Sequence, residues 1–85
     1  MAEITNIDKT IREFPIDEVL RKMQEMNWQY RGEPVTREKL ENTINFVAYQ
    51  LCYTHRNVEC GTGGIAGILH DNGEFELWFT GGKNL

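Results

Sequence analysis

The sequence lacks the long apolar segments of a membrane protein. No apolar run approaches the roughly 18 to 20 residues that cross a bilayer, and the charged start MAEITNIDKTIRE contains no stretch like the apolar part of a secretory signal. Internal repeats, low-complexity tracts and linkers are also absent. We therefore expect the 85 residues to form one soluble domain located in the cytoplasm.

Cysteine is scarce, with only Cys52 and Cys60. A small secreted domain that relied on disulfides would usually carry more, so both residues are expected to be free thiols. Together with His55 and His70 they supply the ligand types that zinc accepts. Structural zinc sites, however, pair their ligands two to four residues apart, whereas nine residues separate Cys60 from His70. We predict no metal site and no cofactor.

A catalytic centre is not indicated either. A cysteine nucleophile would need a base such as His55 or His70, and a third group to orient that base. The acids Asp71, Glu74 and Glu76 cluster near a turn, where solvated carboxylates usually serve solubility. We predict no catalytic residue, and a cysteine or zinc enzyme is kept as a third hypothesis.

Positive charge is in short supply. Nine Lys and Arg stand against 13 Asp and Glu, which gives a net charge of −4. The cations alternate with acids instead of gathering in one segment, so the chain should repel nucleic-acid phosphates and anionic membrane surfaces. Direct binding to nucleic acid or to a membrane is not expected.

Apolar periodicity predicts three helices. The first is short and ends at Pro15; the second covers about residues 15–26; the third covers residues 37–54 and is capped by Thr36. The first stripe consists of Ile4, Ile7, Ile11 and Phe14, and the second of Ile16, Val19, Leu20, Met23 and Met26. The third consists of Leu40, Ile44, Val47, Ala48 and Leu51, and Phe46, Tyr49 and Cys52 widen it.

Two segments have the pattern of strands. NWQYR alternates aromatic and polar residues and is followed by the turn-like GEP. Later, Asn72-Gly73 predicts a β-hairpin with a two-residue type I′ turn. That turn pairs His70 with Phe75, Ile68 with Leu77 and Ala66 with Phe79 on a core face. It pairs Leu69 with Glu76, Gly67 with Trp78 and Ile65 with Thr80 on the other face.

These elements predict an α+β domain with two layers and the order α-α-β-α-β-β. The early strand, the long helix and the next strand would form a right-handed parallel unit. The hairpin would add an antiparallel strand, which gives a three-stranded sheet covered by the helix of residues 37–54.

The glycine-rich stretch CGTGG precedes the hairpin. Phosphate-binding turns usually lead into a helix, whereas this stretch leads into a strand and is not followed by Lys-Ser or Lys-Thr. Gly61 and Gly63 are therefore interpreted as easing entry into the strand, and alanine at either position should be milder than valine at Gly73.

The second face of the hairpin predicts a surface for a partner, because aromatic residues flanked by polar ones are common in binding hot spots. Trp28 and Tyr30 would extend this surface if the first strand lies beside the hairpin. The alternative is that the N-terminal helices cover this face, and a basic partner would then meet the acidic edges at Glu33, Glu38, Glu41 and Glu59. The predicted partner-binding residues are Ile65, Leu69, Glu74, Glu76, Trp78, Trp28 and Tyr30.

In size, acidity, cytosolic cysteines and the order of a short helix followed by a Gly-Gly hairpin, the chain resembles small accessory proteins encoded by phages and prophages. The resemblance implies a non-catalytic inhibitor that binds and blocks a host or phage protein, including components of defence systems, in the cytoplasm of a bacterial host. An alternative hypothesis is a protein that sequesters a small ligand or nucleotide between Trp28, Tyr30 and the GTGG loop. A homodimer formed through an edge strand is also predicted.

Overall fold

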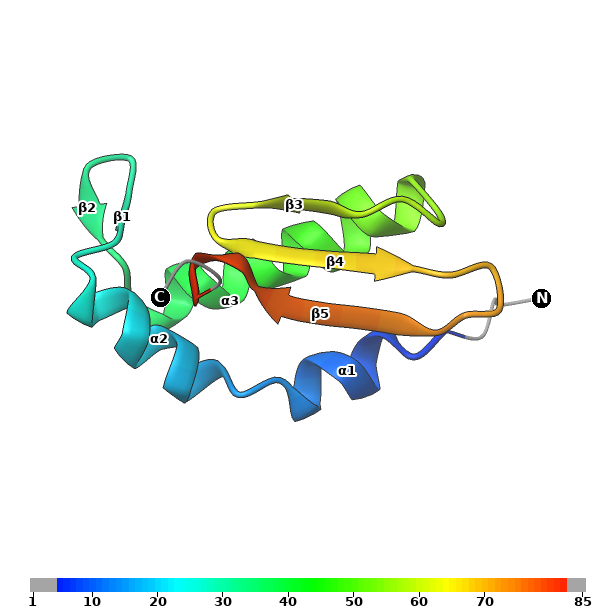
Figure 1. The fold of residues 1–85 in the computed structure, drawn as a ribbon, viewed down its shortest axis with the longest axis horizontal. Helices are drawn as coiled ribbons and strands as arrows, with labels where there is room; N and C mark the ends of the chain where they lie inside the picture. The colour runs from blue at the N-terminus through cyan, green and yellow to red at the C-terminus, as the bar shows by residue number, and fades with distance from the viewer. Residues whose placement is uncertain (1–4, 83–85) are drawn as a thin grey trace.

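The computed structural model describes residues 5–82, which form a small α+β fold (Figure 1). The α+β class predicted from the sequence is confirmed, while Ile4 of the first predicted stripe lies outside the described residues. In chain order the elements are α1 (Ile7–Glu13), α2 (Ile16–Glu25), β1 (Gln29–Tyr30), β2 (Glu33–Pro34), α3 (Arg37–Phe46), the π-helix η1 (Val47–Cys52), β3 (Cys60–Thr62), β4 (Ile65–Leu69), β5 (Phe75–Phe79) and the 3₁₀-helix η2 (Thr80–Gly82).

The strands form two separate antiparallel sheets: a ribbon of β1 and β2, and a three-stranded sheet in the order β3-β4-β5. The predicted parallel unit was wrong. Arg31 and Gly32 both have positive φ, at 53° and 79°, and Tyr30 pairs with Glu33 across them. This is the geometry of a two-residue type I′ turn. It returns the chain at once along β1, so β1 pairs with its own neighbour and never joins the main sheet.

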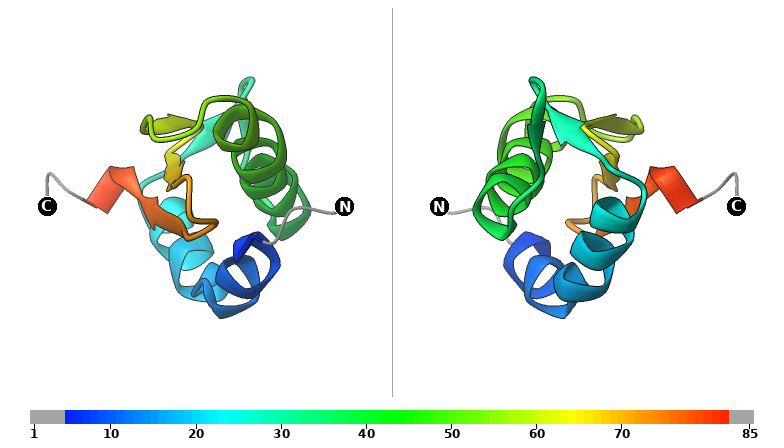
Figure 2. Two further views of the ribbon diagram at one scale, coloured as in Figure 1. Left: turned by 90° about the vertical axis from the view of Figure 1, so that its right-hand side faces the viewer. Right: turned by 90° about the vertical axis from the view of Figure 1, so that its left-hand side faces the viewer.

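The helices enclose the space beside one face of the main sheet (Figure 2). The α3–η1 segment packs against β3 and β4, α1 packs against β5, and α2 packs against α3. The predicted faces of α2 and α3 are confirmed at Val19, Met23, Leu40 and Ile44, all of which are buried. The predicted cap is also confirmed, because the Thr36 hydroxyl accepts a hydrogen bond from the backbone N–H of Lys39.

One part of the predicted helix stripe was wrong. Phe46 and Tyr49 were expected to widen the buried face of the third helix, but 43% and 46% of their surfaces are exposed. The buried positions Leu40, Ile44 and Val47 already fill the side that faces the sheet. Phe46 and Tyr49 lie outside this stripe, and the Tyr49 hydroxyl donates a hydrogen bond to the Asp8 carboxylate of α1.

The register of the β4–β5 hairpin differs by one residue from the predicted register. Leu69 pairs with Phe75 and Ala66 with Trp78, because the loop contains three residues instead of two. Its backbone bonds run from Gly73 N–H to His70 O at 3.0 Å and from His70 N–H to Glu74 O at 2.8 Å. Only Gly73 has positive φ, at 91°. This combination is a type I turn followed by a glycine bulge.

The glycine-rich stretch forms a second hairpin. Thr62 pairs with Ile65, and the two residues between them, Gly63 and Gly64, have φ values of 64° and 89°. These values fit a type I′ turn, which favours residues without a Cβ. CGTGG is therefore the edge strand β3 and its turn into β4, whereas the sequence had indicated a loop here.

Candidate functional site

The outer face of the β4–β5 hairpin carries the first candidate site. Because side chains alternate along a strand, the observed register places Ala66 and Ile68 of β4 on the same face as Glu76 and Trp78 of β5. Ala66 is buried, with 4% of its surface exposed, Ile68 and Trp78 are half-buried, and Glu76 is exposed. Glu74, just before β5, is exposed as well.

Two of the predicted partner-binding residues do not lie on this face. Only 1% of Ile65 and 0% of Leu69 is exposed, and both belong to the core. The physical reason is the extra loop residue, because a register change of one residue moves every side chain of one strand to the opposite face. Ala66 and Ile68 take the places that were assigned to Ile65 and Leu69.

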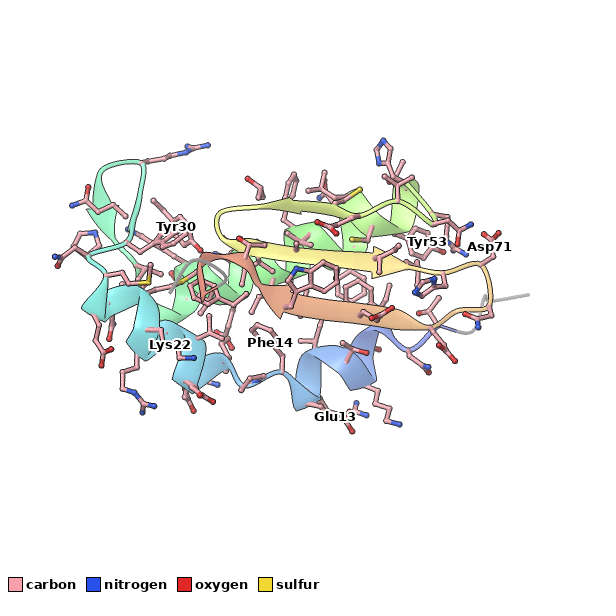
Figure 3. All side chains as sticks on the ribbon, viewed as in Figure 1. Glu13, Phe14, Lys22, Tyr30, Tyr53 and Asp71 are labelled. Atoms are coloured by element: carbon pink, nitrogen blue, oxygen red, sulfur yellow. The ribbon has the colours of Figure 1, made fainter. Side chains whose placement is uncertain are left out.

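A groove runs along β5 beside this face. Its volume is about 440 Å³, and it separates β5 from α2 and from the break between α1 and α2. Pro15 ends α1, and Phe14 points from this break towards β5 (Figure 3). We call the outer face and this groove together the hairpin surface. Its residues are Ala66, Ile68, Glu74 and Glu76, with Phe14, Pro15, Glu18, Val19, Lys22, Leu77, Trp78 and Phe79 lining the groove.

Polar contacts set the position of Glu76 on the hairpin surface. Its Oε2 lies 2.7 Å from Nε2 of His70, which precedes the turn. At the other end of the groove, Lys22 Nζ lies 3.9 Å from Glu18 Oε1. Surface pairs of this kind contribute little to stability, so these charges are available to a partner at small cost.

Trp28 has a packing role at the end of the hairpin. Its ring lies 5.8 Å from that of Phe79, and a Cβ added to Gly64 or Gly81 would come within 2.7 Å of its atoms. Phe79 points to the face of β5 opposite Trp78. Trp28 therefore packs against the inner side of the sheet. The sequence-based prediction that Trp28 extends the outer face was wrong.

A second hollow lies between the β1–β2 ribbon and α3, with a volume of about 580 Å³. We call it the ribbon pocket. It is lined by Tyr30, Arg31, Glu33, Lys39, Asn42, Thr43, Phe46 and Thr62.

Tyr30 anchors the ribbon to the glycine turn, as its position in Figure 3 illustrates. Its hydroxyl donates a hydrogen bond of 2.7 Å to Gly63 O, and burial raises the pKa of this phenol. At the pocket wall, Lys39 Nζ lies 2.5 Å from Glu33 Oε1, and the hydrogen bond to this ammonium group lowers the pKa of the Glu33 carboxyl. The ribbon is thus attached to the glycine turn through Tyr30 of β1 and to α3 through Glu33 of β2.

The two cysteines are free thiols and lie close together. Cys52 is fully buried, and its Sγ lies 3.9 Å from the backbone oxygen of Cys60. Burial, with the neighbouring Cys60, raises the pKa of the Cys52 thiol to about 11. A protonated thiol is a poor nucleophile and a poor metal ligand. Among residues 5–82 no group of three or more His, Cys, Asp or Glu side chains is arranged to hold a metal ion.

Alkylation of the native protein with iodoacetamide at pH 8 should modify Cys60 well before Cys52. At a pKa of about 11, only about 0.1% of Cys52 is thiolate at that pH. In the folded protein the pKa of Cys52 lies above its ordinary value of 9.0. The unfolded chain therefore loses this proton first, and the contribution of Cys52 to the free energy of unfolding falls as the pH rises from 9 towards 11. Peptide mass spectrometry over time measures both rates, and equal rates would contradict the buried position of Cys52.

Comparisons with protein families, with curated proteins and with solved structures find no match to this chain. Within the described part of the chain, none of the helices has the length and apolar character needed to traverse a bilayer. The hairpin surface and the ribbon pocket are therefore the two features from which a function can be inferred.

Proposed function

We propose that this protein is a non-catalytic binding protein that recognises another protein through the hairpin surface. The observation that carries the proposal is the position of Trp78, which belongs to the outer face of the sheet and also lines the groove beside β5. A tryptophan at the junction of a flat face and an apolar groove has the composition and the shape of an interface hot spot.

The charges around Trp78 indicate the kind of partner. Glu74 and Glu76 are exposed beside the apolar centre, and the chain as a whole carries a net charge of −4. Acidic groups at the rim of an interface speed up association with a basic surface and disfavour acidic partners. We expect a partner with an apolar projection, which enters the groove, flanked by Lys or Arg.

Binding of this kind fits an inhibitor that covers a functional surface of its partner. The sequence-based hypothesis of a phage-type accessory protein that blocks a host component, including a defence protein, is part of this proposal. A homodimer remains a separate prediction, which light scattering on the purified protein tests directly.

A pull-down from the native host tests the proposal, with wild type compared with the double variant Trp78→Ala, Glu76→Lys. We expect wild type to retain a specific protein that the double variant loses. Phe46→Ala is the matched control, because it removes an exposed aromatic ring from α3, away from the hairpin surface. Circular dichroism confirms that each variant is folded.

The captured protein is then produced separately and added to wild type in a hydrogen-exchange experiment. Protection should be concentrated in residues 66–68 and 76–79. A partner that binds the double variant as tightly as wild type, or protects only other residues, would show that the hairpin surface is not the binding site.

A further inference from the structure

The ribbon pocket contains a cation that the fold does not use. Arg31 occupies the tip of the β1–β2 ribbon and is exposed. Its guanidinium group forms no hydrogen bond or ion pair with another residue of the described range 5–82. Its backbone φ of 53° belongs to the left-handed region, which glycine and asparagine adopt at lower cost. Neither turn geometry nor a contact within the described fold accounts for an arginine here.

The net charge of the pocket is opposite to that of the protein. Lys39 is neutralised by Glu33 at 2.5 Å, which leaves the positive charge of Arg31 uncompensated among the lining residues. The chain as a whole carries −4. A local positive site on an acidic protein attracts small anions, and a guanidinium group binds carboxylates and phosphates through two parallel hydrogen bonds.

The other walls supply a flat apolar surface and neutral polar groups. Phe46 is 43% exposed although it lines the pocket, so its ring is accessible for stacking. Asn42 and Thr62 are exposed and can donate and accept hydrogen bonds. The hydroxyl of Thr43 already donates to Lys39 O at 3.0 Å and retains its acceptor capacity. Aromatic rings with a few placed polar groups are typical of small-molecule sites.

We infer that the ribbon pocket binds a small anionic molecule with a flat aromatic ring, the chemistry of a nucleoside monophosphate. Arg31 holds the anionic group, Phe46 stacks on the ring, and Asn42 with Thr62 contact its polar edge. The ligand-binding alternative predicted from the sequence had used Trp28 and the glycine turn. Trp28 instead packs against Phe79, Gly64 and Gly81, and only Tyr30 and Thr62 of that prediction line the pocket.

Titrations followed by ¹⁵N–¹H NMR test this inference with AMP, GMP, CMP and UMP as probes. At least one nucleotide should shift the amides of residues 31–33, 42–46 and 62 at concentrations up to a few millimolar. Adenosine and ribose 5-phosphate, which each lack one half of AMP, should bind at least about tenfold more weakly if ring and anion both contribute. Equal binding of AMP and either fragment, or silence from all four nucleotides, would overturn the inference.

Two variants locate the site. Arg31→Asn removes the charge and places a residue that favours positive φ in the turn, so the fold is retained while nucleotide binding falls about tenfold or more. Phe46→Ser should cause a comparable loss. Arg21→Gln removes one exposed cation from α2 that does not line the ribbon pocket, and it should not change nucleotide binding. If Arg21→Gln weakens binding as much as Arg31→Asn, the effect is one of overall charge and the pocket is not the site.

Discussion

Replacing Leu69 with alanine should lower the free energy of unfolding by about 3 kcal/mol, within the range for fully buried leucines. The side chain is 0% exposed and belongs to the same core cluster as Ile65 and Phe75. Its neighbour Ile68 lies on the outer face and is half-buried. Ile68→Ala should therefore cost less, about 1 kcal/mol, because part of its surface remains in water. Urea denaturation followed by circular dichroism measures both changes.

The pair of variants distinguishes the two registers of the hairpin. A two-residue Asn72-Gly73 turn would bury Ile68 and expose Leu69, which reverses the order of the two effects. A larger loss for Ile68→Ala than for Leu69→Ala would therefore show that the three-residue loop is wrong. It would also return Leu69 to the outer face beside Trp78.

Gly61→Ala should destabilise the protein by about 2 kcal/mol or more, in the range of overpacked sites. A Cβ at this position would overlap the backbone oxygen of Ile65 and would lie 2.7 Å from Cα of Ala66. Both obstacles are backbone atoms of the paired strand, so relief requires β3 to move away from β4. The sequence alone had indicated a milder effect than that of valine at Gly73, because it did not identify β3 as a strand.

Gly32→Ala is the matched control for this effect. The space around Gly32 is open, with no atom within 4 Å of a Cβ, and its φ is 79°. The expected cost is the conformational strain alone, about 1 kcal/mol. Thermal and urea denaturation of both variants compare the cost of steric overlap with β4, at Gly61, with the cost of backbone strain, at Gly32. Equal losses at the two positions would show that the contact with β4 is relieved without cost.

The helices could be predicted from the sequence because their apolar spacing is strong. Val19 and Met23 mark the buried face of α2, and Leu40, Ile44 and Val47 that of the α3–η1 segment. The width of the buried stripe could not be predicted. Phe46 and Tyr49 are apolar enough to be buried, and only the position of the α3–η1 segment against the sheet leaves them exposed.

The type of turn was beyond what the sequence determines. Both candidate turns place Gly73 at positive φ, as observed, and both contain Asn72 immediately before it. The choice depends on contacts that are distant in sequence. The backbone N–H of Asn6 donates to Gly73 O at 2.8 Å, and the core accepts Ile65 and Leu69 from β4. Such contacts are invisible to a local pattern.

The candidate sites were predictable to different degrees. Alternation along residues 75–79 predicted that Glu76 and Trp78 lie on one face, and the observed register agrees. The ribbon pocket required knowledge that β1 folds back on β2 and that Tyr30 reaches Gly63. An arginine followed by glycine between two short polar segments was the one available signal for the ribbon turn.

The contact between α1 and β5 affects the order in which the fold can assemble during synthesis. The Thr10 hydroxyl donates to Phe75 O across 65 positions of sequence, and α1 lies along β5 (Figure 1). At about 5–20 residues per second, a ribosome needs roughly 3 to 13 seconds to make that interval. During this time Ile7 and Ile11 have no strand to cover. Of the described helices α1 leaves the ribosome before the others, yet it is among the last to reach its native position. Until β5 has been made, the apolar face of α1 is open to chaperones and to other nascent chains.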